Sequence, residues 1–379
     1  MQYFYWYLYV LLWVFAFIAP NIGLKAQQRL MAFYCGIWAF VFGFRRYDVD
    51  NDTPGYVAYF ENVGTGDGYG TVDRPFETIE EGFWFLSKIV NFFTESATVA
   101  FLIIGITLWS LIYQLYKNNS KTPLLSLLFM MTIGRMFNVL ECMVRQTTSI
   151  IVILAGILCI QKSGITEWKR IFRNKWAMAG IILCLLSVTV HRTTGMLMAV
   201  MGLIYFIRIN KTLSYLLIFG FAVFAIFGAA AFGELFDMAM LLIGGFSNEN
   251  VNLLGDRYIG DVDGNKGFSI GAMLAWVFPT MLTVYLTKKE KVNTYFFKVF
   301  MFSYCLHQLM QFSTMHDRLI ALFILVGFTI VIPEICNRQR NMYYLYLLIG
   351  LYYVILSYKV FYTWPLQDQP VVPYYFIWQ

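Results

Sequence analysis

Charged residues are scarce in this chain. Only 13% of its 379 residues are charged, whereas 59% are hydrophobic and 19% are aromatic. The mean hydropathy is +0.61. This composition excludes an ordinary soluble domain and is typical of a polytopic membrane protein. Apolar stretches recur from end to end, so no water-soluble domain fits between them.

Three further absences narrow the choice of function. The run 1–20 lacks a basic start and a small-residue cleavage pattern, so we expect a retained first helix rather than a signal peptide. The six cysteines show no paired loop spacing and are expected to be packing residues. The acidic run 48–52 does not match a full calcium loop, although its alternate aspartates leave a cation site as the alternative. We therefore do not expect a metal ion at this run.

The apolar stretches predict the fold class. A bilayer core of about 30 Å needs roughly 20 apolar helical residues. Twelve spans are predicted at 3–19, 28–44, 97–116, 122–141, 146–161, 176–190, 194–207, 213–232, 268–287, 296–314, 319–333 and 342–362. The chain is thus predicted to be an all-α, polytopic, single transmembrane domain over 1–379, with large extracytoplasmic loops at 45–96 and 233–267.

The cationic residues sort into alternate loops and set the predicted topology. Seventeen of the 28 cations lie on one side, where only three of the 22 acids accompany them. By the positive-inside rule this side is cytoplasmic, which places both termini outside.

The kind of cation differs between the two sides. Inside, 11 of the 17 cations are lysine, whereas outside, 8 of the 11 are arginine. These outer arginines are Arg45, Arg46, Arg74, Arg135, Arg145, Arg192, Arg257 and Arg318. Guanidinium binds phosphate or carboxylate through paired donors that an ammonium lacks, so we expect the active face to be the outer one. The alternative is ion pairing with outer acids, above all for Arg74.

The two outer loops are long enough to hold structure. In the first, the glycine-rich segment 62–71 predicts a flexible turn region, and the aromatic segment 83–93 predicts a short helix lying in the membrane interface. The second loop, 233–267, has the length of a functional lid.

Within the first loop, the run 45–52 puts an arginine pair beside three carboxylates, with Tyr56 close behind. Such a cluster can hold a phosphate while a carboxylate takes a proton from a sugar hydroxyl. Glu80 and Glu81 open the predicted interfacial helix. For Glu80, a favourable acid at a helix N-terminus is the competing interpretation.

Two outer turns carry the other candidates. Arg145 and Gln146 open the fifth span, where the helix N-terminus adds partial positive charge suited to a pyrophosphate; a Glu141–Arg145 pair is the alternative. His191 and Arg192 form the turn between spans six and seven, where histidine can exchange protons near neutral pH or simply be solvated. His307 is interpreted as a packed polar residue, and Arg318 as the stronger candidate at the outer end of the tenth span.

The order of these motifs resembles that of a known family, the EpsG-like, Wzy-related exopolysaccharide polymerases, over nearly the whole chain. The matching positions are Arg46, Asp52 with Tyr56, Glu81 with Gly82 and Phe83, Arg145 with Gln146, His191 with Thr193 and Thr194, Arg257 with Tyr258, and Pro373 with Tyr374. Two departures are Asp50-Asn51, where the family often has Gly-Thr, and Arg192-Thr193, where serine commonly follows the histidine.

The resemblance implies a metal-independent GT-C-type glycosyltransferase, without a cofactor, on the outer face of a bacterial cytoplasmic membrane. It implies a growing glycan on undecaprenyl pyrophosphate as donor and a lipid-linked repeat unit as acceptor. Asp52 is the favoured base, with Glu81 and His191 as rivals. The expected substrate-binding residues are Arg46, Tyr56, Arg145, Gln146, Arg192, Arg257, Tyr258 and Arg318. Membrane lipid, a flippase and a chain-length regulator are the expected partners, and no nucleic acid is expected.

Three other classes fit parts of the pattern. A polysaccharide ligase would share the donor site and differ in its acceptor. A flippase for lipid-linked glycans would carry charges along a path through the bilayer, yet the inner halves of the predicted spans hold almost none. An O-acyltransferase would need a His–Asp pair facing the cytoplasm, and His316-Asp317 is predicted to lie outside.

Overall fold

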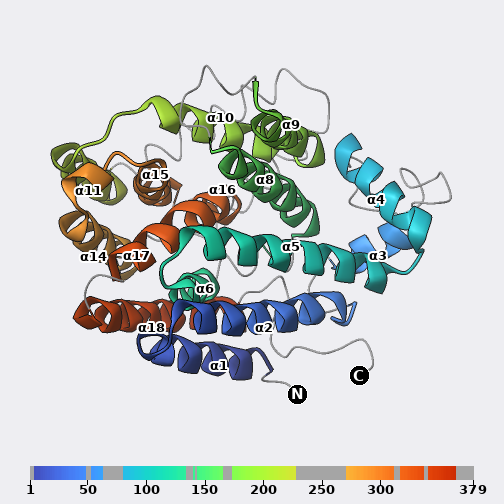
Figure 1. The fold of residues 1–379 in the computed structure, drawn as a ribbon, viewed down its shortest axis with the longest axis horizontal. Coiled ribbons are helices and arrows are strands. Elements are labelled where there is room, and N and C mark those ends of the chain that lie inside the picture. Colours follow the sequence, from blue (N-terminus) through green and yellow to red (C-terminus); the bar gives the residue numbers. More distant parts are fainter. Residues whose placement is uncertain are drawn as a thin grey trace. The chain divides into compact units, whose positions relative to one another are not determined.

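The computed structural model describes residues 4–47, 53–62, 80–133, 140, 143–164, 173–227, 270–310, 316–336 and 340–363. Every regular element formed by these residues is helical (Figure 1). The chain divides into two compact units, Met1–Leu203 with Ile332–Gln379, and Ile204–Val331. Each unit is described by itself.

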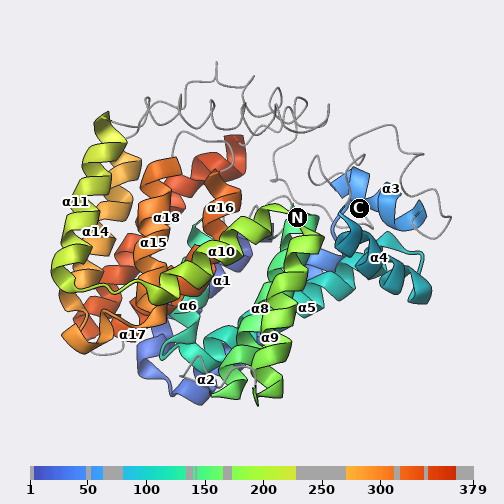
Figure 2. The same cartoon turned by 90° about the horizontal axis from the view of Figure 1, so that it is seen from above.

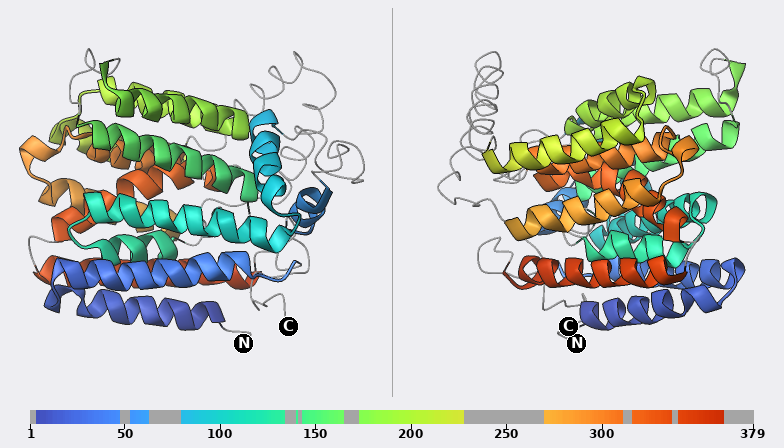
Figure 3. Two further views of the ribbon diagram at one scale, coloured as in Figure 1. Left: turned by 45° about the vertical axis from the view of Figure 1, so that its right-hand side comes forward. Right: turned by 90° about the vertical axis from the view of Figure 1, so that its left-hand side faces the viewer.

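The first unit contains most of the helices. They are α1 (Phe4–Ile18), η1 (Ala19–Asn21), α2 (Leu24–Gly43), α3 (Thr53–Asn62), α4 (Glu81–Phe93), α5 (Ala97–Asn119), α6 (Pro123–Thr132), α8 (Val144–Ser163), α9 (Lys175–Val190), most of α10 (Thr193–Phe206) and α18 (Arg340–Thr363). Helices α2 and α5 pack along each other, and so do α8 and α9, which run side by side in Figures 2 and 3.

The second unit is built around α11, α14 and α15. Its elements are α11 (Lys211–Phe227), α14 (Ile270–Leu286), η5 (Lys289–Lys291), α15 (Tyr295–Met310), α16 (His316–Phe323), the π-helical segment η6 (Ile324–Phe328) and the first part of α17 (Thr329–Cys336). Helix α15 packs against α11, α14 and η6.

Each of the twelve predicted spans overlaps a helix or a consecutive run of helices. By length and composition, two helices in the described part of the chain are able to cross a bilayer, α5 and α8. Shorter apolar helices accompany them. The apolar helices formed by the described residues are consistent with a membrane protein. The fourth predicted span is helical as α6 as far as Thr132, and most of its remainder lies outside the described residues.

The predicted loop 45–96 holds one helix that was predicted and one that was not. The predicted helix 83–93 is confirmed as α4, in which Phe83 is buried and Phe92 is 84% exposed. Helix α3 occupies a stretch where no helix was predicted. It begins at Thr53-Pro54, and proline is well tolerated in a first helical turn because its missing N–H has no helical partner there.

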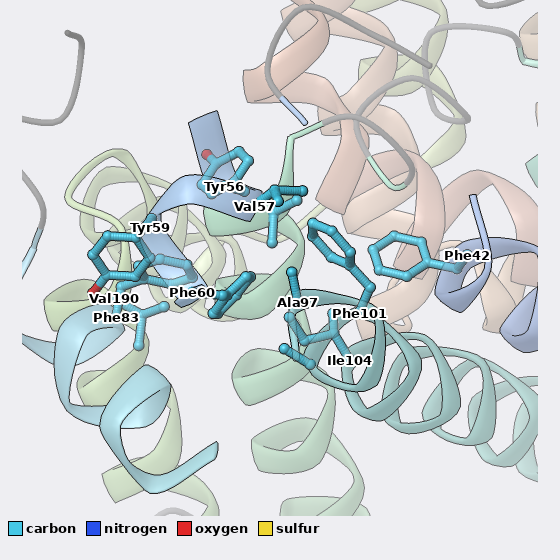
Figure 4. Close-up of a cluster of buried hydrophobic side chains, with 12 residues drawn as sticks. Phe42, Tyr56, Val57, Tyr59, Phe60, Phe83, Ala97, Phe101, Ile104 and Val190 are labelled. Atoms are coloured by element: carbon cyan, nitrogen blue, oxygen red, sulfur yellow. The ribbon is translucent and has the colours of Figure 1, made fainter. Parts of the chain in front are cut away.

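An aromatic cluster holds α3 and α4 against α5 (Figure 4). Tyr59 of α3 stacks on Phe83 of α4 with ring centroids 5.6 Å apart, and Phe60 meets Phe101 of α5 edge-on at 5.6 Å. Such pairs are worth about 0.5 to 1.5 kcal/mol each beyond the area they bury. The cluster therefore fixes the position of both short helices.

Two glycines set the separation of α8 and α9. A Cβ on Gly156 would lie 2.6 Å from the Cys184 sulfur and 2.7 Å from the Gly180 carbonyl oxygen. A Cβ on Gly180 would lie 2.6 Å from the Gly156 carbonyl oxygen. Only hydrogen fits at either position, so the two backbones approach closely at this crossing.

Candidate functional site

A polar cluster lies where four elements of the first unit meet. The Arg145 Nη1 atom, in the first turn of α8, donates to the Glu80 Oε2 atom across 3.0 Å. The other carboxylate oxygen of Glu80 lies 3.1 Å from the His191 Nδ1 atom, in the turn between α9 and α10. The Arg145 Nε atom also donates to the Tyr56 hydroxyl of α3 across 3.3 Å. We call these four residues the Glu80 cluster.

The location of Glu80 follows from its place just before α4. Its backbone carbonyl accepts the first helical hydrogen bond, from Trp84 N across 3.1 Å, so its side chain lies at the helix end. Close packing brings that end to α9. A Cβ on Gly82 would fall 2.3 Å from the Thr189 Oγ1 atom and 2.7 Å from the Thr189 carbonyl carbon. The glycine allows α4 to begin directly beside the last turn of α9.

The surroundings of Glu80 keep it ionised. Its side chain is only 10% exposed, and this burial by itself raises the pKa of the carboxyl. The hydrogen bond with His191 and the charge of Arg145 outweigh the burial and lower the pKa to about 2. The backbone N–H of Arg192, just before α10, adds a weaker contact of 3.4 Å to the same carboxylate. At neutral pH, Glu80 is therefore a hydrogen-bond acceptor and a poor proton acceptor.

The ionised carboxylate determines which nitrogen of His191 is protonated when the ring is neutral. A carboxylate without a proton can only accept hydrogen bonds, so Nδ1 of His191 carries the hydrogen. In this tautomer, Nε2 has the lone pair and is able to accept a proton. The His191 side chain is 13% exposed, which puts the ring at the margin of the packed interior.

Hydrogen bonds between hydroxyl and carbonyl groups connect α8, α9 and α10 near the cluster. The Ser149 hydroxyl of α8 lies 2.5 Å from the Thr194 hydroxyl of α10 and donates to the Ser187 carbonyl of α9 across 3.2 Å. Ser149 lies one turn after Arg145, so these bonds tie the helix that carries Arg145 to the turn that carries His191. Ser149 and Ser187 were not among the residues predicted for the site.

The two arginines just after α2, Arg45 and Arg46, have different environments. The Arg45 side chain is buried, 2% exposed, and its guanidinium carbon lies 4.5 Å from the ring centroids of both Phe42 and Phe101. Cation–π contacts of this kind are worth about 2 kcal/mol when they are desolvated. Arg46, the predicted substrate-binding residue, is half-buried and follows it in sequence. Arg45 is thus part of the packing between α2 and α5.

The structure brings Tyr56, Arg145 and His191 together, as three of the sequence-predicted site residues. Arg192 joins them through its backbone N–H, while its side chain is exposed. Gln146 is buried next to Arg145, and Glu81 is exposed in the first turn of α4. Asp52, Arg257, Tyr258 and Glu141 lie outside the described residues, and Arg318 lies in α16 of the second unit with its side chain outside them.

Glu80 is the residue that the sequence analysis left out of the site. The motif led to Glu81, and Glu80 had been interpreted equally as an acid favourable to a helix N-terminus. The available signal was its position. The side chain of the residue just before a helix lies at the helix end, where it can accept hydrogen bonds. Within the described ranges, no group of three or more His, Cys, Asp or Glu side chains has the arrangement of a metal site.

Comparison with known proteins adds one relationship. The model of the EpsG family matches residues 28–376, which is nearly the whole chain. No curated protein and no solved structure matches it. Because the match covers far more than half of the sequence and includes every member of the Glu80 cluster, the chain belongs to the EpsG family, a Wzy-like polymerase family.

Proposed function

We propose that the protein is a polysaccharide polymerase of the GT-C type. It transfers a growing glycan from undecaprenyl pyrophosphate to a lipid-linked repeat unit on the outer face of the bacterial cytoplasmic membrane. Membership of the EpsG family supports the polymerase class. The observation that carries the proposal is the Glu80 cluster, in which an arginine at a helix N-terminus and a histidine contact the same carboxylate.

The first requirement of this reaction is a place for the pyrophosphate. Arg145 lies in the first turn of α8, where the backbone amides and the helix dipole add partial positive charge to its guanidinium. Fixed positive charge of this kind stabilises a leaving pyrophosphate, since the negative charge grows as the glycosidic bond breaks. Arg46, Gln146, Arg192, Arg257 and Arg318 stay proposed as further contacts, and Tyr56 and Tyr258 as contacts to phosphate or sugar.

The second requirement is a base for the acceptor hydroxyl. The proton leaves as the hydroxyl oxygen forms its bond to the anomeric carbon, and the bond between that carbon and the pyrophosphate oxygen breaks with its electron pair. Asp52, Glu81 and His191 remain the candidates. Removal of the proton by a positioned side chain contributes roughly 10²- to 10⁴-fold in rate.

The membrane topology belongs to the same proposal. Twelve spans place both termini and the loops 45–96 and 233–267 outside the cytoplasm, so that the Glu80 cluster faces the lipid-linked substrates. A flippase that delivers the repeat units and a chain-length regulator are the proposed partners.

The glycolipid profile of cells that lack this gene tests the function. We expect single undecaprenyl-linked repeat units to accumulate on the outer face and long polymer to disappear. Restored polymer from a plasmid copy is the control. Units trapped on the inner face would instead indicate a flippase, and long lipid-linked polymer that stays unattached would indicate a ligase.

A further inference from the structure

Among the described residues, the Glu80 carboxylate contacts two functional groups at once. Glu80 uses Oε2 for Arg145 and Oε1 for His191, at 3.0 and 3.1 Å. In sequence, these partners lie 65 and 111 residues away from Glu80, so neither contact arises from local helical geometry. A single side chain therefore bridges the guanidinium and the imidazole.

We infer that Glu80 is the positioning residue of the transfer reaction: its carboxylate holds His191 in the Nδ1–H tautomer, with Nε2 as the acceptor for the hydroxyl proton, beside the Arg145 guanidinium. This inference rests on the proposed function and selects His191 among its candidate bases. Glu80 itself does not take the proton, because Arg145 and the Arg192 N–H already stabilise its ionised form.

The charges balance along the reaction. When the acceptor hydroxyl attacks, its proton goes to His191 Nε2 and the ring becomes an imidazolium. The new positive charge forms 3.1 Å from a carboxylate, where it is stabilised. The electron pair of the broken glycosidic bond stays with the pyrophosphate, and the negative charge that grows there is close to Arg145.

Within the described residues, the His191 ring contacts the Glu80 carboxylate, just before α4. That carboxylate also accepts hydrogen bonds from Arg145 of α8, which in turn contacts Tyr56 of α3, and from the backbone N–H of Arg192. Glu80 lies next to α9 because Gly82 allows the close approach to Thr189. Replacement of its carboxylate by an amide would allow an N–H to face Nδ1 and favour the other tautomer, which turns a donor towards the hydroxyl.

Steady-state kinetics test the inference with the full chain in lipid nanodiscs. The probe is the lipid-linked repeat unit extracted from cells that lack the gene. We expect Glu80→Gln to lower kcat by about 10²- to 10³-fold with a smaller change in KM, since the base works mainly in the transition state. Glu80→Asp, which keeps the charge, should recover part of the rate. Glu95→Gln, an exposed acid between α4 and α5, is the matched control and should leave the rate unchanged.

A double variant distinguishes positioning from an independent role. If Glu80 acts through His191, Glu80→Gln combined with His191→Asn should be little slower than His191→Asn alone. Multiplied losses would overturn the inference. Thermal unfolding of each variant in nanodiscs identifies any that fails to fold, and Glu80→Asp then carries the test.

Nitrogen NMR of histidine-labelled protein gives a readout that does not depend on activity. The chain has three histidines, so His191→Asn identifies the His191 signals by their loss. We expect the neutral wild-type ring to carry its hydrogen on Nδ1 and the Glu80→Gln ring to shift towards Nε2. Hydrogen on Nε2 in the wild type, or normal turnover in Glu80→Gln, would overturn the inference alone. Absence of polymer from the wild-type protein would overturn the proposed function as well.

Discussion

His191 and His307 show two ways in which this chain accommodates a histidine. His191 lies at the margin of the first unit, and its Nδ1 contacts a carboxylate that is 111 residues away in sequence. His307 lies in α15 of the second unit, 7% exposed, and its ring stacks on Trp276 of α14 with centroids 4.2 Å apart. The first environment pairs a ring with a buried carboxylate, and the second packs a ring as an aromatic core residue.

The difference teaches that the partner of each ring, rather than the neighbouring sequence, distinguishes a histidine paired with a carboxylate from one packed among aromatic side chains. Both residues lie near predicted outer span ends or within spans, and both had a structural interpretation beside the functional one. The packed interpretation of His307 agrees with its stacking on a neighbouring helix. For His191, the contact with an ionised carboxylate favours the functional interpretation.

Separate substitutions of the two histidines should show the largest difference in turnover. We expect His191→Asn to lower turnover by about 10²- to 10⁴-fold, because the proton acceptor is lost. His307→Phe keeps a ring on Trp276 and should leave turnover close to that of the wild type. Polymer formation in nanodiscs measures both. Normal turnover in His191→Asn, with loss in Asp52→Asn, would transfer the role of base to Asp52.

The substitution Arg145→Lys tests the role of Arg145, the other partner of Glu80. A lysine keeps the charge but cannot donate to Glu80 and Tyr56 from two nitrogens of one plane. We expect turnover to fall by about 10²- to 10³-fold, the usual loss for one positioned donor to a developing negative charge. Arg29→Lys, an exposed arginine of α2, is the control. Wild-type polymer levels from Arg145→Lys would contradict the pyrophosphate role.

Gly82→Ala should move the cluster without changing any of its polar groups. The new methyl group would overlap the backbone of Thr189, so α4 must shift away from α9. We expect a loss of about 1 to 3 kcal/mol in stability from overpacking. Turnover should fall roughly ten- to a hundredfold, since a displacement near 1 Å misplaces the reacting groups.

Gly36→Ala provides the matched control for that change. Gly36 lies in α2, and a Cβ there would meet nothing within 4 Å. An alanine in a helix interior should raise stability by roughly 0.5 to 1 kcal/mol, with turnover unchanged. Equal behaviour of the two alanine variants in thermal unfolding would refute the close approach of α4 to α9.

The last expected effect is the dependence of stability on pH. The pKa of Glu80 is lowered from 4.5 to about 2 in the folded protein, so the unfolded chain binds the proton more readily between these values. The contribution of Glu80 to stability is therefore complete above about pH 5 and is lost as the pH falls towards 2. Glu80→Gln should remove this part of the decline. Matching Tm curves for the two proteins below pH 4.5 would contradict the assignment.

The helices were largely predictable because long apolar runs leave few other structures open to the chain. Helix α3 was missed, since its ten residues between two polar stretches show no length or periodicity that distinguishes a helix from a loop. Arg145 and His191 were predicted as candidates from charge, sidedness and resemblance. Glu80 could not be separated from Glu81 because the two are adjacent in sequence, and only the start of α4 decides which one faces α8 and α9.

The glycine crossing of α8 and α9 has a mechanical consequence for the Glu80 cluster. Arg145 lies 11 residues before Gly156, and His191 lies 11 residues after Gly180. At 1.5 Å per residue, Arg145 and His191 each lie about 16 Å along the helix from this crossing point. A change of 4° in the crossing angle would therefore displace either residue by roughly 1 Å. The absence of side chains at Gly156 and Gly180 thus helps to set the alignment of the guanidinium with the imidazole, because it fixes how closely and at what angle α8 and α9 cross.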